Sequence, residues 1–177
     1  RRGGYQDINV ARSLEVSSNI GVSYVIDKFY HNNPEKYVGG LYRVGINEDL
    51  KLPISGYHPP KIRMPQKNKR GKYTNWSKTS LPWMSIGYET QIAPINTVTF
   101  YNAIANDGKM MRPRFVKQVV KDGVVIKDFP PEVIKEQIAK PEAIATMQTM
   151  LEHVVSQGLG KKAGSKLFKV AGKTGTA

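Results

Sequence analysis

Two short polar motifs near opposite ends of the chain carry the side chains best suited to chemistry. Ser17-Ser18-Asn19 lies near the start, and Lys173-Thr174-Gly175 lies near the end. A hydroxyl and a carboxamide can each donate and accept hydrogen bonds, whereas an ammonium donates and adds positive charge. Each tripeptide alone is weak evidence, because serine and asparagine also cap helices and a strand-end lysine is often only solvated. Together, in this order and one domain's length apart, they predict a shared site.

The Gly172-Lys173-Thr174 triplet also suggests a phosphate-binding loop. Such a loop needs an earlier glycine at a fixed spacing, where the backbone bends so that its amides can cradle phosphate. Leu167 occupies that position, and Gly164 lies too far back. The spacing therefore argues against a nucleotide-binding loop.

Metal and triad chemistry have little support in the sequence. The chain has no cysteine, so it offers no disulfide, thiolate ligand or cysteine nucleophile. Its histidines, His31, His58 and His153, form no pair with ligand spacing. Isolated histidines without a nucleophile elbow do not make a Ser-His-Asp triad. We expect neither a metal site nor a cofactor.

Composition indicates a folded, strongly basic chain. Of its 177 residues 40% are hydrophobic and 23% are charged, with a formal net charge of +13. No apolar run approaches the roughly 18 residues of a membrane span. The charge favours anionic partners and keeps a basic nucleic-acid-binding module as a remote alternative. Interleaved aromatics and a recognisable binding motif are lacking, so we expect no nucleic acid partner.

Local patterns predict mostly helices, one hairpin and one short strand. N-cap residue types precede apolar residues at helical spacing in the first thirty residues, and prolines and glycines mark other helix ends. Asp122-Gly123, between two apolar runs, predicts a tight hairpin. The expected helices are one within Ala11–Tyr30, one from Pro34 to about Gly45, one from Pro94 towards Gly108 and one from Pro141 to just before Gly158, and the expected strand is Leu167–Val170.

Residues 53–82 have a different composition from the rest of the chain. They are rich in proline, glycine and cations, they show no lasting period, and a basic cluster spans Lys67 to Lys72. We interpret this range as a basic surface excursion within the domain rather than as a ligand-binding patch.

Three stretches then resemble a known family. "SSNIGVS", "SIGYETQIAPINTVTFYNAIANDGKMMRP" and "VAGKTGTA" are similar, in sequence and in order, to the transpeptidase domain of class B penicillin-binding proteins, closest to the division-type branch. The resemblance covers most of Leu14 to Ala177. The family's nucleophile is a serine followed three places later by lysine, and no serine of this chain has lysine at that distance. The resemblance places that tetrad upstream of Arg1.

The resemblance implies an α+β fold of the β-lactamase and penicillin-binding transpeptidase type. An antiparallel sheet flanked by helices would be incomplete here, with residues 1–177 as the middle and late part of one transpeptidase domain. The nucleophile segment and the final strands would lie outside the chain. The strand carrying Lys173 would then have an unpaired edge, which favours self-association.

The same resemblance implies roles for individual residues. Ser17 would relay a proton to the leaving group, Asn19 would hold a substrate amide, and Lys173 would stabilise developing negative charge. Thr174, Gly175 and Thr176 would bind substrate, and the Thr176 N–H would form half of an oxyanion hole. The nucleophile itself would not come from this chain.

The implied activity is peptidoglycan D,D-transpeptidation. A serine acyl-enzyme would cross-link stem peptides and would be the target of β-lactams, at the outer face of the cytoplasmic membrane in the cell envelope. The chain alone is predicted to be inactive, its anchor is expected elsewhere, and cell-division membrane proteins are expected partners. Alternatives are a β-lactamase or a D,D-carboxypeptidase of the same fold and a non-catalytic penicillin-binding-like scaffold. "GYETQIAP" favours the transpeptidase.

Overall fold

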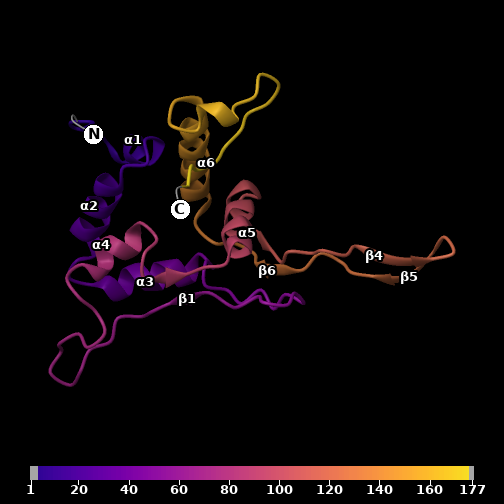
Figure 1. Cartoon of the computed structure of the whole chain (residues 1–177), viewed down its shortest axis with the longest axis horizontal. Helices are drawn as coiled ribbons and strands as arrows, with labels where there is room; N and C mark the ends of the chain where they lie inside the picture. Colours follow the sequence, from indigo (N-terminus) through magenta and orange to yellow (C-terminus); the bar gives the residue numbers. More distant parts are fainter. Residues whose placement is uncertain (1–3, 176–177) are drawn as a thin grey trace. The chain divides into compact units, whose positions relative to one another are not determined.

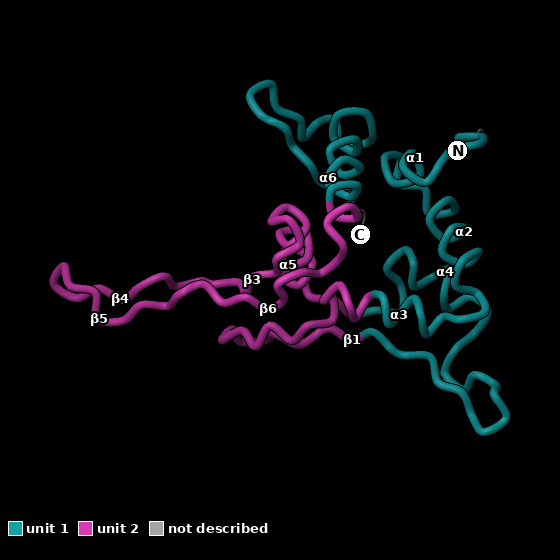
Figure 2. The backbone as a smooth tube through the Cα atoms, turned by 180° about the vertical axis from the view of Figure 1, so that it is seen from behind, with its two compact units in different colours: residues 1–40, 62–90, 145–177 teal, residues 41–61, 91–144 magenta. Residues whose placement is uncertain are grey.

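A computed structural model describes residues 4–175 of the chain. The fold is α+β, and its strands form three two-stranded sheets, β1–β2, β3–β6 and β4–β5. The chain divides into two compact units (Figure 2). Unit 1 holds residues 1–40, 62–90 and 145–177, and unit 2 holds residues 41–61 and 91–144. None of the helices within residues 4–175 has the length and apolar character needed to cross a membrane.

Unit 1 is built mainly from helices. The helix expected after the N-cap residue types at Ser17-Ser18-Asn19 is present, and a separate short helix precedes it. The Ser18 side chain caps the expected helix by accepting a hydrogen bond from the Gly21 N–H at 3.1 Å. Buried side chains of this unit include Val16, Val38, Leu81, Met84, Leu151 and Val154. Its helices are α1 (Val10–Glu15), α2 (Asn19–Tyr30), α3 (Pro34–Arg43), α4 (Ser80–Ser85) and α6 (Pro141–Ser156), followed by η1 (Lys161–Ala163); the end of α3 and the start of α6 belong to unit 2.

Two serine side chains join α2 to α4. The hydroxyl of Ser23 lies 3.2 Å from that of Ser85 and donates to the carbonyl of Pro82, also at 3.2 Å. The Ser85 hydroxyl donates to the same carbonyl at 2.7 Å. These bonds hold α2, which starts at Asn19, against the end of α4 and the residues that follow it.

Unit 2 is organised around α5 (Pro94–Ala105). The helix starts at the predicted proline, and the chain then turns through Gly108, whose φ is +97°. Asn96 is buried and donates from Nδ2 to the Glu48 carbonyl at 2.8 Å. β3 (Met110–Met111) pairs antiparallel with β6 (Val133–Lys135). Buried apolar side chains of the unit include Leu50, Ala103, Ile104, Met110 and Ile138.

The predicted hairpin is confirmed by β4 (Gln118–Lys121) and β5 (Val124–Asp128), which pair antiparallel. Asp122 and Gly123 form its turn with φ angles of 50° and 79°, as a primed turn requires. Every residue of both strands is exposed. In Figure 1 the hairpin is a long, thin ribbon beyond β3 and β6.

Residues 53–82 follow the predicted pattern of an excursion with little regular structure. Its regular elements within the described chain are short: β1 (Lys61–Ile62), which pairs with β2 (Thr90–Gln91), an isolated bridge from Lys67 to Tyr73, and the first turn of α4. Glu35 of α3 fixes the bridge, because its carboxylate accepts from the Tyr73 hydroxyl at 2.9 Å and pairs with the Lys67 ammonium at 3.1 Å.

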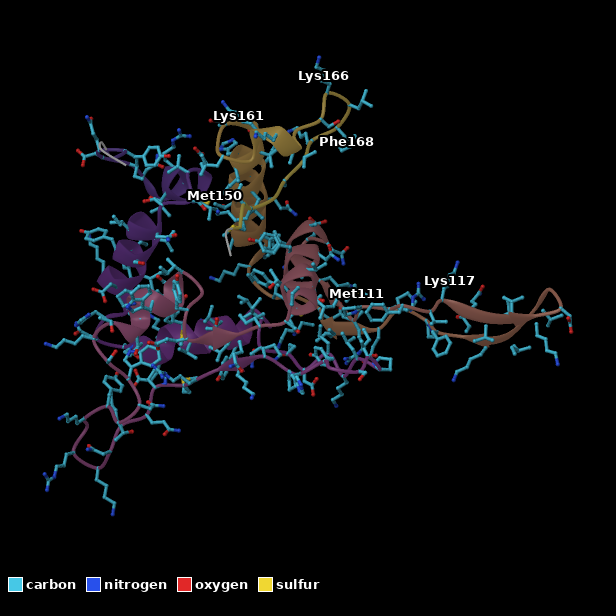
Figure 3. The ribbon with its side chains drawn as sticks, in the orientation of Figure 1. Met111, Lys117, Met150, Lys161, Lys166 and Phe168 are labelled. Atoms are coloured by element: carbon cyan, nitrogen blue, oxygen red, sulfur yellow. The ribbon has the colours of Figure 1, made fainter. Side chains whose placement is uncertain are left out.

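The strand expected at Leu167–Val170 is wrong. These residues form a bend and irregular chain after η1, and the side chains of Leu167 and Phe168 are 90% and 67% exposed. Figure 3 shows Phe168 and Lys166 on this loop. A strand needs a neighbour for its backbone N–H and C=O groups, and within the described residues no strand pairs with this segment. The helix from Pro141 does end before Gly158, as predicted.

Candidate active site

Ser17 lies in the turn between α1 and α2. Its backbone adopts a left-handed φ of 54°, which is uncommon for a residue with a side chain and costs about 1–3 kcal/mol. The turn is fixed by the Ser17 N–H donating to the Leu14 carbonyl and by the Ser18 N–H donating to the Ser13 carbonyl. Because Ser18 caps α2, the hydroxyl of Ser17 is available for other contacts.

Lys173 lies on the C-terminal segment, which we define as residues 170–175. The Gly172 N–H donates to the carbonyl of Leu151 on α6 at 3.1 Å and so anchors this segment to the helix. Nζ of Lys173 then donates to three oxygens: the Ser17 hydroxyl, the Thr174 carbonyl at 3.0 Å and the Thr174 hydroxyl at 3.2 Å. Three partners match the three N–H donors of an ammonium. The structure thus brings together residues 156 positions apart in the sequence.

Burial alters the acid–base chemistry of this lysine. Partial desolvation lowers the pKa of the Lys173 amine from its ordinary value of 10.5, because burial disfavours the charged form. The Ser17 and Thr174 hydroxyls lie 3.5 Å apart, so the amine and two hydroxyls form one hydrogen-bonded cluster. An amine held against a hydroxyl can supply or remove its proton, which makes this cluster suitable for relaying protons during acyl transfer.

Asn19 is the first residue of α2 and is exposed. Its side chain lines a shallow groove of about 450 Å³ together with Ile20, Tyr24, Pro82 and Trp83. Among the described residues, Asn19 is not one of the hydrogen-bond partners of the Lys173 amine. The predicted residues therefore lie in two parts, a cluster around Lys173 and a neighbouring groove that starts at Asn19.

Gly175 is exposed, and an added Cβ atom would meet nothing within 4 Å. This end of the C-terminal segment is thus open to an approaching backbone. Thr176, predicted to bind substrate and to provide an oxyanion-hole N–H, lies outside the described residues. Within residues 4–175, no group of three or more His, Asp or Glu side chains is gathered as metal ligands.

The sequence analysis missed the role of α6 in the site. The carbonyl of Leu151 holds the segment that carries Lys173, and the carbonyl of Glu15, just before Ser17, accepts from the N–H of Leu159 beyond the end of α6. Backbone hydrogen bonds do not depend on side-chain type, so no sequence pattern marks Leu151. Gly158 was a weak sequence signal for this contact, because glycine has no side chain and lets another backbone approach the end of α6 closely.

Comparison with protein families gives one match over the whole chain. The family model described as the penicillin binding protein transpeptidase domain matches residues 1–177. The penicillin-binding protein PbpB of Mycolicibacterium smegmatis is 28% identical over 173 residues, covering 91% of this chain and 24% of that protein. Peptidoglycan D,D-transpeptidase FtsI of Escherichia coli K12 is 27% identical over 179 residues, covering 98% of this chain and 26% of that protein. The chain thus spans about a quarter of these relatives' length.

Solved structures share the fold. Penicillin binding protein 3 of Mycobacterium tuberculosis, complexed with ampicillin, superposes with a TM-score of 0.73 at 26% identity, covering 96% of this chain and 36% of that one. The transpeptidase domain of penicillin-binding protein 3 from Burkholderia pseudomallei gives 0.72 at 25% identity, covering 97% and 46%. Both matches include the two units described above.

Proposed function

Because this chain belongs to the penicillin-binding protein transpeptidase domain family, we propose that it is part of a peptidoglycan D,D-transpeptidase. The activity is that of the longer protein containing these residues, which we call the parent protein. The observation that carries the proposal is the contact between the Lys173 amine and the Ser17 hydroxyl, two groups from motifs at opposite ends of the chain. A cluster of this kind suits serine acyl transfer, in which protons must move at the reacting carbonyl and at the leaving amine.

We propose the following reaction for the parent protein. A nucleophilic serine gives its proton to the lysine of the family's tetrad, and its oxygen attacks the carbonyl between the two terminal D-alanines of a stem peptide. The resulting tetrahedral intermediate expels D-alanine as an amine. The Ser17 hydroxyl gives its proton to that amine and is reprotonated through the hydrogen-bonded cluster. Lys173 lowers the free energy of the negative charge that develops nearby. An amine from a second stem peptide then attacks the acyl-enzyme, the ester bond to the serine breaks as the cross-linking amide bond forms, and the proton lost by the amine returns to the released serine.

The remaining predicted residues would orient the substrate. The Asn19 carboxamide offers a donor and an acceptor at one end of the groove, which suits a substrate amide. Thr174 and Thr176 would bind the terminal carboxylate of the stem peptide. The open space beside Gly175 would let the substrate backbone lie along the C-terminal segment as an added strand. A β-lactam would enter the same position and acylate the same serine, in keeping with the ampicillin complex of the mycobacterial relative.

No serine in these 177 residues has lysine three positions later, so we assign the nucleophile to another part of the parent protein. We further propose that the parent protein works at the outer face of the cytoplasmic membrane with cell-division membrane proteins. The peptidoglycan activity named for the Escherichia coli relative FtsI supports a place in the cell envelope, whereas the outer-face position and the membrane partners stay predictions from the resemblance. The self-association expected from an unpaired strand edge at Lys173 loses its premise, because residues 170–175 form no strand.

Fluorescent penicillin labelling tests the proposed function. The purified parent protein is expected to give a labelled band on a denaturing gel, because the acyl-enzyme is covalent. Residues 1–177 expressed alone are expected to give none. Ser17→Ala in the parent protein is expected to slow labelling by about a hundredfold or more. An unlabelled parent protein would refute the proposed function, and a labelled isolated chain would refute the assignment of the nucleophile to another part of the parent protein.

A further inference from the structure

We propose that Glu15 is a positioning residue that sets the distance between the Ser17 hydroxyl and the Lys173 amine. It does so by fixing α1 against the C-terminal end of α6. The inference rests on the proposed function, because it concerns the same site. Figures 1 and 2 show α1 beside α6 within unit 1.

The Glu15 carboxylate is buried between the two helices. Its side chain is 8% exposed, Oε2 accepts from Nη1 of Arg12 at 2.9 Å, and Oε1 lies 3.5 Å from Nδ1 of His153 on α6. Nη1 of Arg12 also reaches the carbonyl of Gln157, the residue after α6, at 3.4 Å. A buried carboxylate is costly unless it is paired, so these partners fix where the side chain can be.

The backbones of the two helices also meet at this point. The N–H of Leu159 donates to the Glu15 carbonyl at 3.0 Å. A Cβ atom added to Gly158 would lie 2.3 Å from the Glu15 carbonyl oxygen and 2.8 Å from that of Val154. The approach is therefore too close for any residue other than glycine. Glu15 is held to α6 through both its side chain and its backbone.

Both halves of the site thus depend on one helix. Ser17 follows Glu15 by two residues, and Glu15 is fixed to the end of α6. Lys173 follows Gly172, whose N–H is bonded to Leu151 of α6. Figure 3 labels Met150, the neighbour of Leu151, on this helix. A shift of α1 along α6 would move the Ser17 hydroxyl but leave Lys173 in place, and so would separate the two groups.

The test measures acylation kinetics of the purified parent protein with a chromogenic penicillin. The limiting acylation rate constant and the apparent dissociation constant are determined separately, together with the unfolding temperature. Glu15→Ala is expected to lower the limiting rate about tenfold to a hundredfold, because a displacement of about 1 Å has effects of this size. The dissociation constant is expected to change little. Glu15→Gln keeps the shape and is expected to show a smaller loss in the same direction.

Glu136→Gln is the matched control. It makes the same chemical change as Glu15→Gln, but at a carboxylate of unit 2 whose side chain is 75% exposed and pairs with Lys109. The limiting acylation rate of Glu136→Gln is expected to equal that of the wild type. If Glu15→Ala does not fold, His153→Ala replaces it, because it removes only the partner on α6. A wild-type limiting rate in the variant, with or without a lower unfolding temperature, overturns the inference. An unlabelled wild-type parent protein instead overturns the proposed function and the inference with it.

Discussion

The Ser17–Lys173 cluster and the β4–β5 hairpin hold their residues in place in opposite ways. The cluster joins residues 156 positions apart, and each half is fixed by hydrogen bonds to α6 or to the residues that follow it. The hairpin joins close sequence neighbours, such as Lys121 with Val124, through its own ladder. The cluster forms only when the helices of unit 1 pack, whereas the strand pairing of the hairpin is set by its own turn and ladder.

The two regions also differ in how far their side chains are exposed to solvent and in the acid–base chemistry that those side chains can perform. The strands of the hairpin are exposed along their whole length, although they carry valines and an isoleucine. A two-stranded ribbon of this kind is only marginally stable by itself. The cluster is partly buried, and burial lowers the pKa of Lys173. Polar groups acquire unusual chemistry where tertiary packing removes water, and the hairpin offers no such environment.

The largest expected effect comes from replacing one lysine in each region. Lys173→Ala in the parent protein is expected to slow penicillin acylation about a hundredfold to a thousandfold, because it removes the charge beside Ser17. Lys121→Ala in the hairpin is expected to leave the rate within twofold of wild type, roughly the scatter for an exposed site. Stopped-flow acylation with a chromogenic penicillin measures both. Equal losses at the two positions would remove the functional distinction between the regions.

Two glycine replacements compare the stability cost of lost helix packing with the cost of a strained turn. Gly158 lies where α1 meets the end of α6, and Gly123 lies in the hairpin turn. Gly158→Ala is expected to lower the free energy of unfolding by about 1–3 kcal/mol, since its Cβ would press against the Glu15 carbonyl. Gly123→Ala has open space around it but a φ of +79°, so a loss of about 1 kcal/mol is expected.

Urea unfolding of the parent protein gives these free energies, and acylation rates separate the two variants further. Only Gly158→Ala is expected to slow acylation, because only this change disturbs the contact between α1 and the end of α6. An acylation defect in Gly123→Ala alone would contradict this interpretation.

A pH series tests the burial of Lys173. Its pKa is lowered by desolvation, so between that lowered pKa and 10.5 the unfolded chain binds more protons than the folded chain. The free energy of unfolding contributed by this group is therefore lowest below the folded pKa and rises as pH increases towards 10.5. The unfolding temperature of wild type relative to Lys173→Met is expected to rise over that range. A falling difference would mean that the Lys173 amine is stabilised in its charged form.

The smallest effect is expected on the hairpin surface. Ile126→Thr replaces a side chain that is 60% exposed, so the free energy of unfolding is expected to change by less than about 0.5 kcal/mol. Thermal unfolding and penicillin acylation of the variant should both match wild type. A larger loss of stability would show that the ribbon is covered in the parent protein.

Elements with local signals could be predicted from the sequence. Pro94 and Pro141 start α5 and α6 because proline restricts its own backbone, and Asp122-Gly123 forms the hairpin turn because aspartate tolerates and glycine permits a positive φ. The strand expected at Leu167–Val170 did not form, although its residue types suit a strand. Strand formation requires a partner, and sequence composition does not supply one.

The sequence supplied candidate residues for the site but not their geometry. The two motifs predicted roles for Ser17, Asn19 and Lys173 through the resemblance to a known family. The structure brings Ser17 and Lys173 into contact, and those roles stay predictions. The cap by Ser18 agrees with the N-cap residue types seen in the sequence, whereas the left-handed backbone of Ser17 and the buried carboxylate of Glu15 became visible only in the folded chain. A glutamate two residues before a serine is too common to be a signal.

The sequence by itself determined which reactive groups the chain possesses, where α2, α3, α5 and α6 begin and where the hairpin turns, because these depend on residue type and on near neighbours. Only the tertiary structure decided that a hydroxyl and an amine from distant segments share hydrogen bonds. It also decided that the amine is partly desolvated. Both depend on how α1 and the C-terminal segment dock on α6, and such docking reflects shape and backbone hydrogen bonding, which no short pattern of residues encodes.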